Sequence, residues 1–467
     1  MMRGPLVALA AALAMLAAPR GALGLGPHEV ALLINTNSAV SVKIGCVYAT
    51  LRCIPDANVI RLGLPERVLA PVAEISAEDY LVLIWAPATN AIAAQGIGDH
   101  ILAWAFTPGF PVRLRTTPVI SIVGATFLRG RLPDSEQVKM GTYASPLFAG
   151  PDALGATAYS SRSLDVQTAW MGGEAPIPSM MLGYAGERGN TEDVITASLV
   201  RAAEADCKAP AGVVYFVLSD DVRSECRAWE FSGAARELYS VGGRAVVTNG
   251  FPVGADDVVG LMVGLPTLDP RAVARYPAGA MADHLTSFGA VFDTDEQTKI
   301  SAWIDAGVTV TAGTVTEPYA NWAKFPHARF FVHYRAGCTA LESFFQSIRC
   351  PLQTLLLGDP LVRPYAPANR LVLERPATAG PASGSVTVQF DVEGPARESY
   401  GRFVVLLDGR VIGEVRKGNA YTVETGLYAG GRHSLRVVGY RTGLVRNQVF
   451  AEMPLVIADG VVDKGSP

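Results

Sequence analysis

The sequence has no excess of charge of either sign, and it has few charged residues overall. Its 39 lysines and arginines stand against 43 aspartates and glutamates, which gives a net charge of −4. Without a basic excess there is little to neutralise a phosphate backbone, so nucleic acid is not expected as a partner. Charged residues make up 18% of the chain and hydrophobic residues 49%, which excludes a disordered chain. A length of 467 residues predicts two or three folded units.

The motifs that hold common cofactors and metals are missing. No G-x-G-x-x-G follows the first expected strand and no G-x-x-x-x-G-K-[ST] occurs, which disfavours a dinucleotide or P-loop nucleotide. H-E-x-x-H and C-x-x-C are also absent, and the six histidines are scattered apart from Asp283-His284 and the neighbours His327 and His333. We expect no cofactor and no metal, and we interpret these histidines as structural.

Long hydrophobic runs are also missing, except for residues 6–18. Arg3 precedes this run and the small residues Ala22 and Gly24 follow it, which predicts a signal peptide over 1–24 and a mature chain that starts near Leu25. The run is shorter than the roughly 20 residues that a membrane-spanning helix needs, which disfavours an anchor. We therefore expect an exported protein, periplasmic or extracellular, with no membrane span in the mature chain.

The chain has six cysteines at positions 46, 53, 207, 226, 338 and 350. An exported protein can form disulfides, but the two closely spaced pairs flank helical patterns and are too far apart to bridge. Bridges between distant segments and free buried thiols both remain open.

Apolar runs alternate with amphipathic stretches over most of the chain, which predicts an α/β layered sandwich with a mainly parallel sheet. The expected subdomains are residues 25–130 and 179–367, separated by a long loop or insertion at 131–178 that is rich in Gly, Ser and Pro. Within the second subdomain, Thr294 and Gln297 resemble a capping box for a helix that buries Ile300, Trp303 and Ile304.

The pattern changes after residue 367. Val386, Val388, Phe390 and Val392 alternate strictly with polar residues, and an Asp-Gly turn at 408–409 joins two further apolar runs. This predicts an immunoglobulin-like β-sandwich over 385–467, after a linker region at 368–384.

Polar side chains follow several expected strands, where α/β sheets usually carry their sites. Each also has a simpler interpretation as a helix cap or turn residue. The ligand-binding candidates are Asn35, Asn37, Asp220, Ser287, Glu317 and Tyr319.

Nucleophilic catalysis would need a serine or cysteine beside a base. Ser287 follows His284 and Cys338 follows His333. His284 and Ser287 are expected to project to opposite faces of one extended segment, and Cys338 is equally well interpreted as a buried thiol.

Several short segments between residues 28 and 366 form a distinctive combination, including PAGAMADHLTS at 277–287, GTVTEPY at 313–319 and LLLGDPLVRPY at 355–365. Together they resemble a family of uncharacterised exported bacterial proteins, distantly similar to caspase-like and gingipain-type peptidases. The resemblance implies the scaffold, so the expected fold is an α/β sandwich of caspase-like or flavodoxin-like type. It would place His-Gly after one central strand and Cys after the next, where this chain has Gly264-Leu265-Pro266 and Thr286-Ser287.

These observations predict a non-catalytic binding or scaffold protein, a pseudo-enzyme whose extracytoplasmic ligand or protein partner the sequence does not name. The alternative is a peptidase-like hydrolase that uses an unrecognised site built from Asp220, Ser287 and Glu317. Convergence of these three side chains in one cleft would favour the hydrolase, and dispersal would favour the binding protein.

Overall fold

The computed structural model describes residues 24–459, except 69–73, 170, 172–173, 375–379 and 417. Most of the expected signal peptide and part of the expected linker therefore lie outside the described residues. Among the described residues, no helix is both long enough and apolar enough to cross a membrane.

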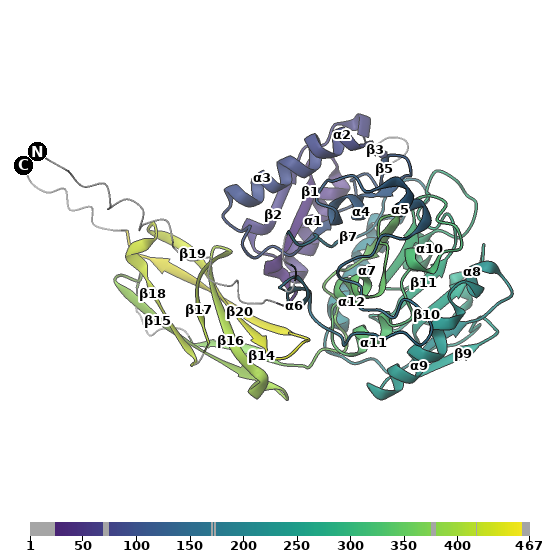
Figure 1. Cartoon of the computed structure of the whole chain (residues 1–467). Coiled ribbons are helices and arrows are strands. Elements are labelled where there is room, and N and C mark those ends of the chain that lie inside the picture. The colour runs from purple at the N-terminus through teal and green to yellow at the C-terminus, as the bar shows by residue number, and fades with distance from the viewer. Residues whose placement is uncertain are drawn as a thin grey trace, which may run out of the picture.

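The chain forms an α/β body and a C-terminal β domain (Figure 1). The body is built on one mixed sheet of ten strands, so strands of both expected subdomains share a single sheet. In spatial order the strands are β2 (Val59–Leu62), β1 (Val30–Asn35), β4 (Ala103–Phe106), β7 (Ser179–Met181), β13 (Thr354–Gly358), β12 (Val310–Thr314), β11 (Met281–Leu285), β10 (Val258–Gly264), β8 (Val213–Val217) and β9 (Ala245–Thr248).

The sheet is mostly parallel, as the sequence predicted. β2, β1, β4 and β7 pair in parallel with their neighbours, and so do β12, β11, β10, β8 and β9. β13, the last strand of the body in the chain, lies between these two sets. It runs antiparallel to β12 and meets β7 at the single pair Leu357 and Met181.

Helices pack on both faces of this sheet, which explains why its strands are apolar on both sides. Trp303 on α10 joins one apolar cluster with Leu261 and Val263 of β10, whereas Phe331 on α11 packs with Phe216 of β8 in a second cluster. The helices are α1 (Ala39–Arg52), α2 (Ala77–Tyr80), α3 (Ala86–Ala94), α4 (Ile122–Phe127), α5 (Ser135–Met140), α6 (Leu164–Thr168), α7 (Glu192–Ala205), α8 (Val222–Glu225), α9 (Phe231–Ser240), α10 (Ile300–Asp305), α11 (Phe330–Arg335) and α12 (Ala340–Ser347).

The start of α10 differs from the sequence prediction. The helix begins at Ile300, after Lys299, and Gln297 adopts φ 64° before it. The Gln297 Oε1 accepts hydrogen bonds from the Thr286 hydroxyl and from the Phe288 N–H (2.9 Å). The expected capping box is therefore wrong, because the Gln297 side chain closes the preceding loop instead.

The segment 131–178 carries two short helices, α5 and α6, and lies across α12. Its backbone N–H groups at Ser145 and Ala149 donate to the carbonyls of Arg349 and Gln346 (2.8 and 2.9 Å). A second, small sheet joins β3 (Glu74–Ser76), β5 (Arg113–Arg115) and β6 (Ile120–Ser121). The six cysteines are free thiols.

The C-terminal β domain consists of two antiparallel sheets around one apolar core. Its first strand lies within the stretch expected as a linker, because β14 pairs with β15 along five residue pairs. The sheets are β14 (Arg370–Glu374), β15 (Ser385–Glu393) and β18 (Ala420–Glu424), and β17 (Arg410–Val415), β16 (Tyr400–Leu407), β19 (Gly431–Arg441) and β20 (Gln448–Ile457).

Buried polar contacts join the β domain to the body. Glu29, fully buried just before β1, accepts hydrogen bonds from the Tyr440 hydroxyl (2.7 Å) and the Gln448 amide (3.0 Å). The Asn447 amide donates to the Gly337 carbonyl (2.6 Å). Side chains of β19 and β20 are thus fixed against the first described segment of the chain.

We predict that residues 369–467 fold alone as a β domain, because Val388, Phe390, Val405 and Val437 form a core separate from that of the body. Circular dichroism of the isolated fragment is expected to show a strand spectrum and a cooperative thermal transition. A disordered spectrum would mean that the contacts with the body are needed for folding.

Candidate functional site

The carboxyl ends of several body strands lie along one side of the large sheet. We call this side the strand-end edge. Arg113, on β5 after β4, contacts Asp293 after β11 (Nη2 to Oδ2, 3.1 Å) and the carbonyl of Val315 after β12 (3.4 Å). Arg188, after β7, donates to the carbonyl of Phe292 after β11 (3.0 Å). The polar residues selected from the sequence lie at such strand ends.

The width of the sheet separates these residues into groups. β1 and β8 are seven positions apart in the strand order. At about 4.8 Å per strand, their ends are roughly 34 Å apart, so Asn35 and Asp220 cannot contact one ligand of small size. β11 and β12 are neighbours, which places Ser287 and Glu317 at adjacent strand ends.

Asn35 and Asn37 fasten loops to one another. The Asn35 amide donates to the Gly109 carbonyl (2.8 Å), and its Oδ1 accepts from the N–H groups of Asn37 and Leu64 (both 3.1 Å). The Asn37 amide in turn donates to the Leu64 carbonyl (3.1 Å). These bonds connect the segments that follow β1, β2 and β4. The Asn35 and Asn37 side chains therefore have a structural role.

Asp220, Ser287 and Glu317 do not form a catalytic cluster. Asp220 and Glu317 are exposed, and the Glu317 Oε1 accepts a hydrogen bond from the N–H of Tyr319 (2.7 Å). Ser287 is 8% exposed, and its carbonyl accepts from the Thr314 hydroxyl (3.0 Å). Among the described residues, no hydrogen bond joins any two of Asp220, Ser287 and Glu317.

Tyr319 is more than half exposed and adopts φ 60°. Its ring lies 5.7 Å from the Lys324 ammonium. This cation–π contact restrains the exposed ring.

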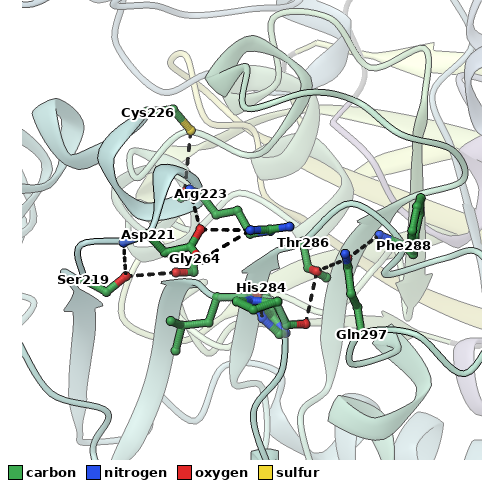
Figure 2. A network of polar contacts seen from close by, with 11 residues as sticks. Ser219, Asp221, Arg223, Cys226, Gly264, His284, Thr286, Phe288 and Gln297 are labelled. Carbon is green, nitrogen blue, oxygen red and sulfur yellow. Dashed lines mark hydrogen bonds and ion pairs between the residues drawn. The ribbon is translucent and has the colours of Figure 1, made fainter.

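The ends of β8, β10 and β11 carry a network of polar contacts that the sequence indicated only in part (Figure 2). The Ser219 hydroxyl donates to the Gly264 carbonyl (3.1 Å) and accepts from the Asp221 N–H (3.4 Å). Asp221 caps α8 through the Arg223 N–H (2.9 Å) and pairs with the Arg223 guanidinium (3.1 Å). The contacts mostly end on backbone groups, so they shape the strand ends.

His284 is committed to this network and does not face a nucleophile. Its Nε2 lies 2.7 Å from the Leu265 carbonyl, which fixes Nε2 as the protonated nitrogen, and its Nδ1 is buried without a partner. Burial lowers the pKa of His284 to about 4. Among the described residues, the Ser287 hydroxyl makes no hydrogen bond to the free Nδ1, so the structure shows no serine–histidine pair here.

The His284 environment predicts a loss of stability in acid. The pKa of His284 in the folded protein is below the ordinary value of about 6.5. The contribution of the neutral imidazole to the free energy of unfolding is therefore complete above pH 6.5 and is lost as the pH falls toward 4. We expect about 2 kcal/mol of unfolding free energy to be lost through this residue between pH 7 and pH 5. Urea titrations of wild type and His284→Gln at both pH values test this: the variant should lose less, and an equal loss would contradict it.

Cys338 and His333 are both buried and are bonded to other groups. The Cys338 Sγ donates to the Arg162 carbonyl (3.7 Å) and accepts from the Gln346 amide (3.6 Å), and burial raises the pKa of its thiol well above the ordinary range. The His333 Nδ1 is hydrogen bonded to the Ser161 hydroxyl (2.9 Å), and burial lowers the pKa of this histidine. The arrangement keeps the thiol protonated, so it is not an activated nucleophile.

An ion pair lies beneath the network. Arg227 and Asp283 are both fully buried, with the guanidinium bonded to the carboxylate and to the Val263 carbonyl (2.7 Å). This pair ties the segment after α8 to β10 and β11. In the sequence, the only sign of this ion pair was a charged residue, Asp283, in the middle of the apolar strand MADHL. Among the described residues no group of three or more His, Cys, Asp or Glu side chains is placed to hold a metal ion.

The sequence did not predict a pocket at the opposite ends of β8 and β10, which we call the α9–α11 pocket. Its volume is 260 Å³, and its apolar wall includes Val214, Leu238, Val259 and Phe331. It was missed because its residues come from five separate segments, each of which is unremarkable in the sequence.

Two arginines supply the charge of this pocket, Arg335 and the exposed Arg244. The Arg335 guanidinium stacks on Tyr365 (4.6 Å) and donates to the Gly242 carbonyl (2.9 Å). Its Nε is buried and has no hydrogen-bond partner among the described residues. Cys207 and Ala209, in the segment that leads into it, adopt φ 60° and 46°, a conformation that non-glycine residues rarely keep without a surrounding constraint.

The chain matches no protein-family model and no curated protein. Among solved structures it is similar to fibronectin(III)-like modules of CbhA from Clostridium thermocellum, at 16% identity over 26% of this chain and 59% of that chain, with a TM-score of 0.18. The chain therefore spans less than two thirds of that structure. Two further similarities are to the spore cortex lytic enzyme SleM of Clostridium perfringens (9% identity, 82% of this chain, 96% of that chain, TM-score 0.18) and an endo-beta-1,4-mannanase from Thermotoga petrophila (11%, 82%, 74%, TM-score 0.17). At these TM-scores the similarities carry no argument about fold or activity.

Proposed function

We propose that this chain is an exported, non-catalytic binding protein that holds a small, largely apolar anion in the α9–α11 pocket. The body would be a caspase-like or flavodoxin-like scaffold, and the C-terminal domain an immunoglobulin-like sandwich that adds recognition or spacing. N-terminal sequencing of protein recovered outside the cytoplasm is expected to begin near Leu25. An intact Met1 in the membrane fraction would overturn the exported part of the proposal.

The binding proposal rests on one observation. The pocket combines an apolar wall with the Arg335 guanidinium, which has a buried donor that makes no hydrogen bond among the described residues. The buried Nε of Arg335 lacks a partner, and a buried donor without a partner is costly. A ligand carboxylate would supply that partner, and an aliphatic or aromatic group would cover Val259 and Phe331. The volume of 260 Å³ favours a ligand smaller than drug size.

The strand-end edge supports the non-catalytic part of the proposal. His284 donates to a backbone carbonyl and the Cys338 thiol is kept protonated by burial. Asp220, Ser287 and Glu317, the groups of the hydrolase alternative, make no hydrogen bond to one another among the described residues.

Calorimetric titration with phenylacetate, hexanoate and the uncharged phenylacetamide tests the pocket. We expect the carboxylates to bind and the amide not to, and Arg335→Gln to weaken binding by about 10-fold or more, the effect of losing a hydrogen bond to a charged group. Ala211→Trp, which fills the mouth of the pocket without removing a charge, should also abolish binding. Exposed Arg236 on α9 provides the control, and Arg236→Gln should bind as wild type does. Unchanged binding in Arg335→Gln and Ala211→Trp, or no binding by wild type, would overturn the proposal.

A further inference from the structure

The C-terminal β domain has a groove that is unusually rich in arginine. It has a volume of 440 Å³, and four of the eight residues that line it are arginines: Arg402 on β16, Arg416 after β17, Arg441 at the end of β19, and Arg446 in the turn before β20. None of the other lining residues is acidic. In a chain with a net charge of −4, such a local concentration of positive charge calls for an explanation.

The surrounding acids neutralise this charge only in part. Arg402 and Arg416 share one carboxylate, that of Glu414 (2.8 and 2.7 Å). Arg446 contacts the Asp165 carboxylate from α6 (2.8 Å). Arg441 is bonded to neutral oxygens, the Ser399 hydroxyl (3.0 Å) and the Asn447 side chain (3.4 Å). Among the described residues, these four guanidinium groups form ion pairs with two carboxylates.

Two of the arginines are held by contacts within the protein. The Arg402 guanidinium lies over the ring of Tyr440, 5.7 Å from its centroid, and the Tyr440 hydroxyl donates to Glu29. The Arg446 Nε donates to the carbonyl of Gly443, which has φ 106° and no atoms near the position of a Cβ. The space above Gly443 is therefore open, and a ligand would find the charges of Arg402 and Arg446 already positioned.

We propose that this groove binds a chain-like ligand that carries several oxyanions, such as a polysaccharide substituted with carboxylate or sulfate groups. Planar guanidinium groups match such oxyanions with paired hydrogen bonds. Several arginines along one groove favour a repeated anion over a single small one. The aromatic Tyr440 is buried beneath Arg402, so recognition rests on charge rather than on stacking against sugar rings.

Binding of fluorescently labelled polygalacturonate and dextran sulfate to the whole protein, with neutral dextran and inorganic phosphate as comparison ligands, tests this proposal. We expect at least one of the two polyanions to bind, neutral dextran not to bind, and affinity to fall at least 10-fold between 50 and 200 mM salt, as about two or more neutralised charges require. The stronger polyanion identifies the oxyanion.

The variant Arg416→Glu reverses a charge whose side chain is mostly exposed, so the fold should tolerate it. We expect it to weaken polyanion binding at least 10-fold, and Arg416→Glu with Arg441→Gln to abolish it. Arg432→Glu makes the same charge change at an exposed position outside the groove and should leave binding unchanged. Arg335→Gln in the α9–α11 pocket should also leave it unchanged, which separates this proposal from the proposed function.

Binding that survives both groove variants would overturn the proposal. Failure of both polymers to bind, or binding of inorganic phosphate alone, would overturn it equally, because the ligand is proposed to carry several linked anions.

Discussion

Replacing Arg227 with methionine is expected to reduce the unfolding free energy of the body by about 3–5 kcal/mol. The substitution leaves the Asp283 carboxyl in the interior, fully buried and without its cationic partner. The Val263 carbonyl loses a donor as well. Urea titration at pH 7 measures the effect, and a loss below about 1 kcal/mol would contradict the burial of the pair.

The double variant Arg227→Met/Asp283→Leu is the matched control. With both charges removed, no unpaired carboxyl remains, and the double variant should be more stable than Arg227→Met alone. The effect should also depend on pH. Burial raises the pKa of Asp283 and Arg227 lowers it, so without Arg227 the buried carboxyl favours its protonated form. The loss of stability is then largest at a pH where the carboxyl of the unfolded chain is ionised. The difference between wild type and Arg227→Met should therefore shrink as the pH falls from 7 toward about 4.

Trp303→Ala is expected to cost about 3–5 kcal/mol, the range for truncating a large buried aromatic side chain. Trp303 is fully buried on α10, with its ring edge-on to Tyr276 and to His284 (centroids 6.3 and 5.7 Å apart). Truncation would open a cavity next to Leu261 and Val263 of β10.

Tyr319→Ala serves as the comparison, because that ring is 58% exposed. It should change stability by about 0.5 kcal/mol or less. Denaturant titration measures the unfolding free energy of both variants. Similarly small losses in the two would place the Trp303 face in solvent and contradict the packing of α10 against β10.

Sequence patterns predicted a helix start correctly where the helix cap and the apolar spacing involve only residues that are close in the chain. The Ser38 cap and the apolar spacing of Val40, Ile44, Val47 and Leu51 predict α1, whose cap bond from the Ser41 N–H is present. Of these four apolar side chains, Ile44 is fully buried. The same rule failed at α10, because the Gln297 side chain serves a distant partner, Thr286, instead of the helix. No local pattern distinguishes these two uses of a polar residue near a helix start.

The candidate site depended on topology, which short-range patterns do not encode. Ser287 and Asp220 follow the ends of β11 and β8. The position of β13 between β7 and β12 and the seven-strand separation of β1 from β8, however, follow only from the assembled sheet. The α9–α11 pocket and the arginine groove bring together segments that are far apart in the chain. Only the folded chain places Arg335 against Tyr365 and brings Arg402 and Arg441 into one groove.

The most direct test of the non-catalytic account compares purified wild type with Ser287→Ala and Cys338→Ala on a broad peptide library, with fluorophosphonate and cysteine-directed electrophile labelling alongside. The account predicts no cleavage by any of the three proteins and no labelling above that of the denatured wild type, because His284 is bonded to Leu265 and the Cys338 thiol is buried and protonated. Cleavage by the wild type that either alanine variant abolishes would contradict it.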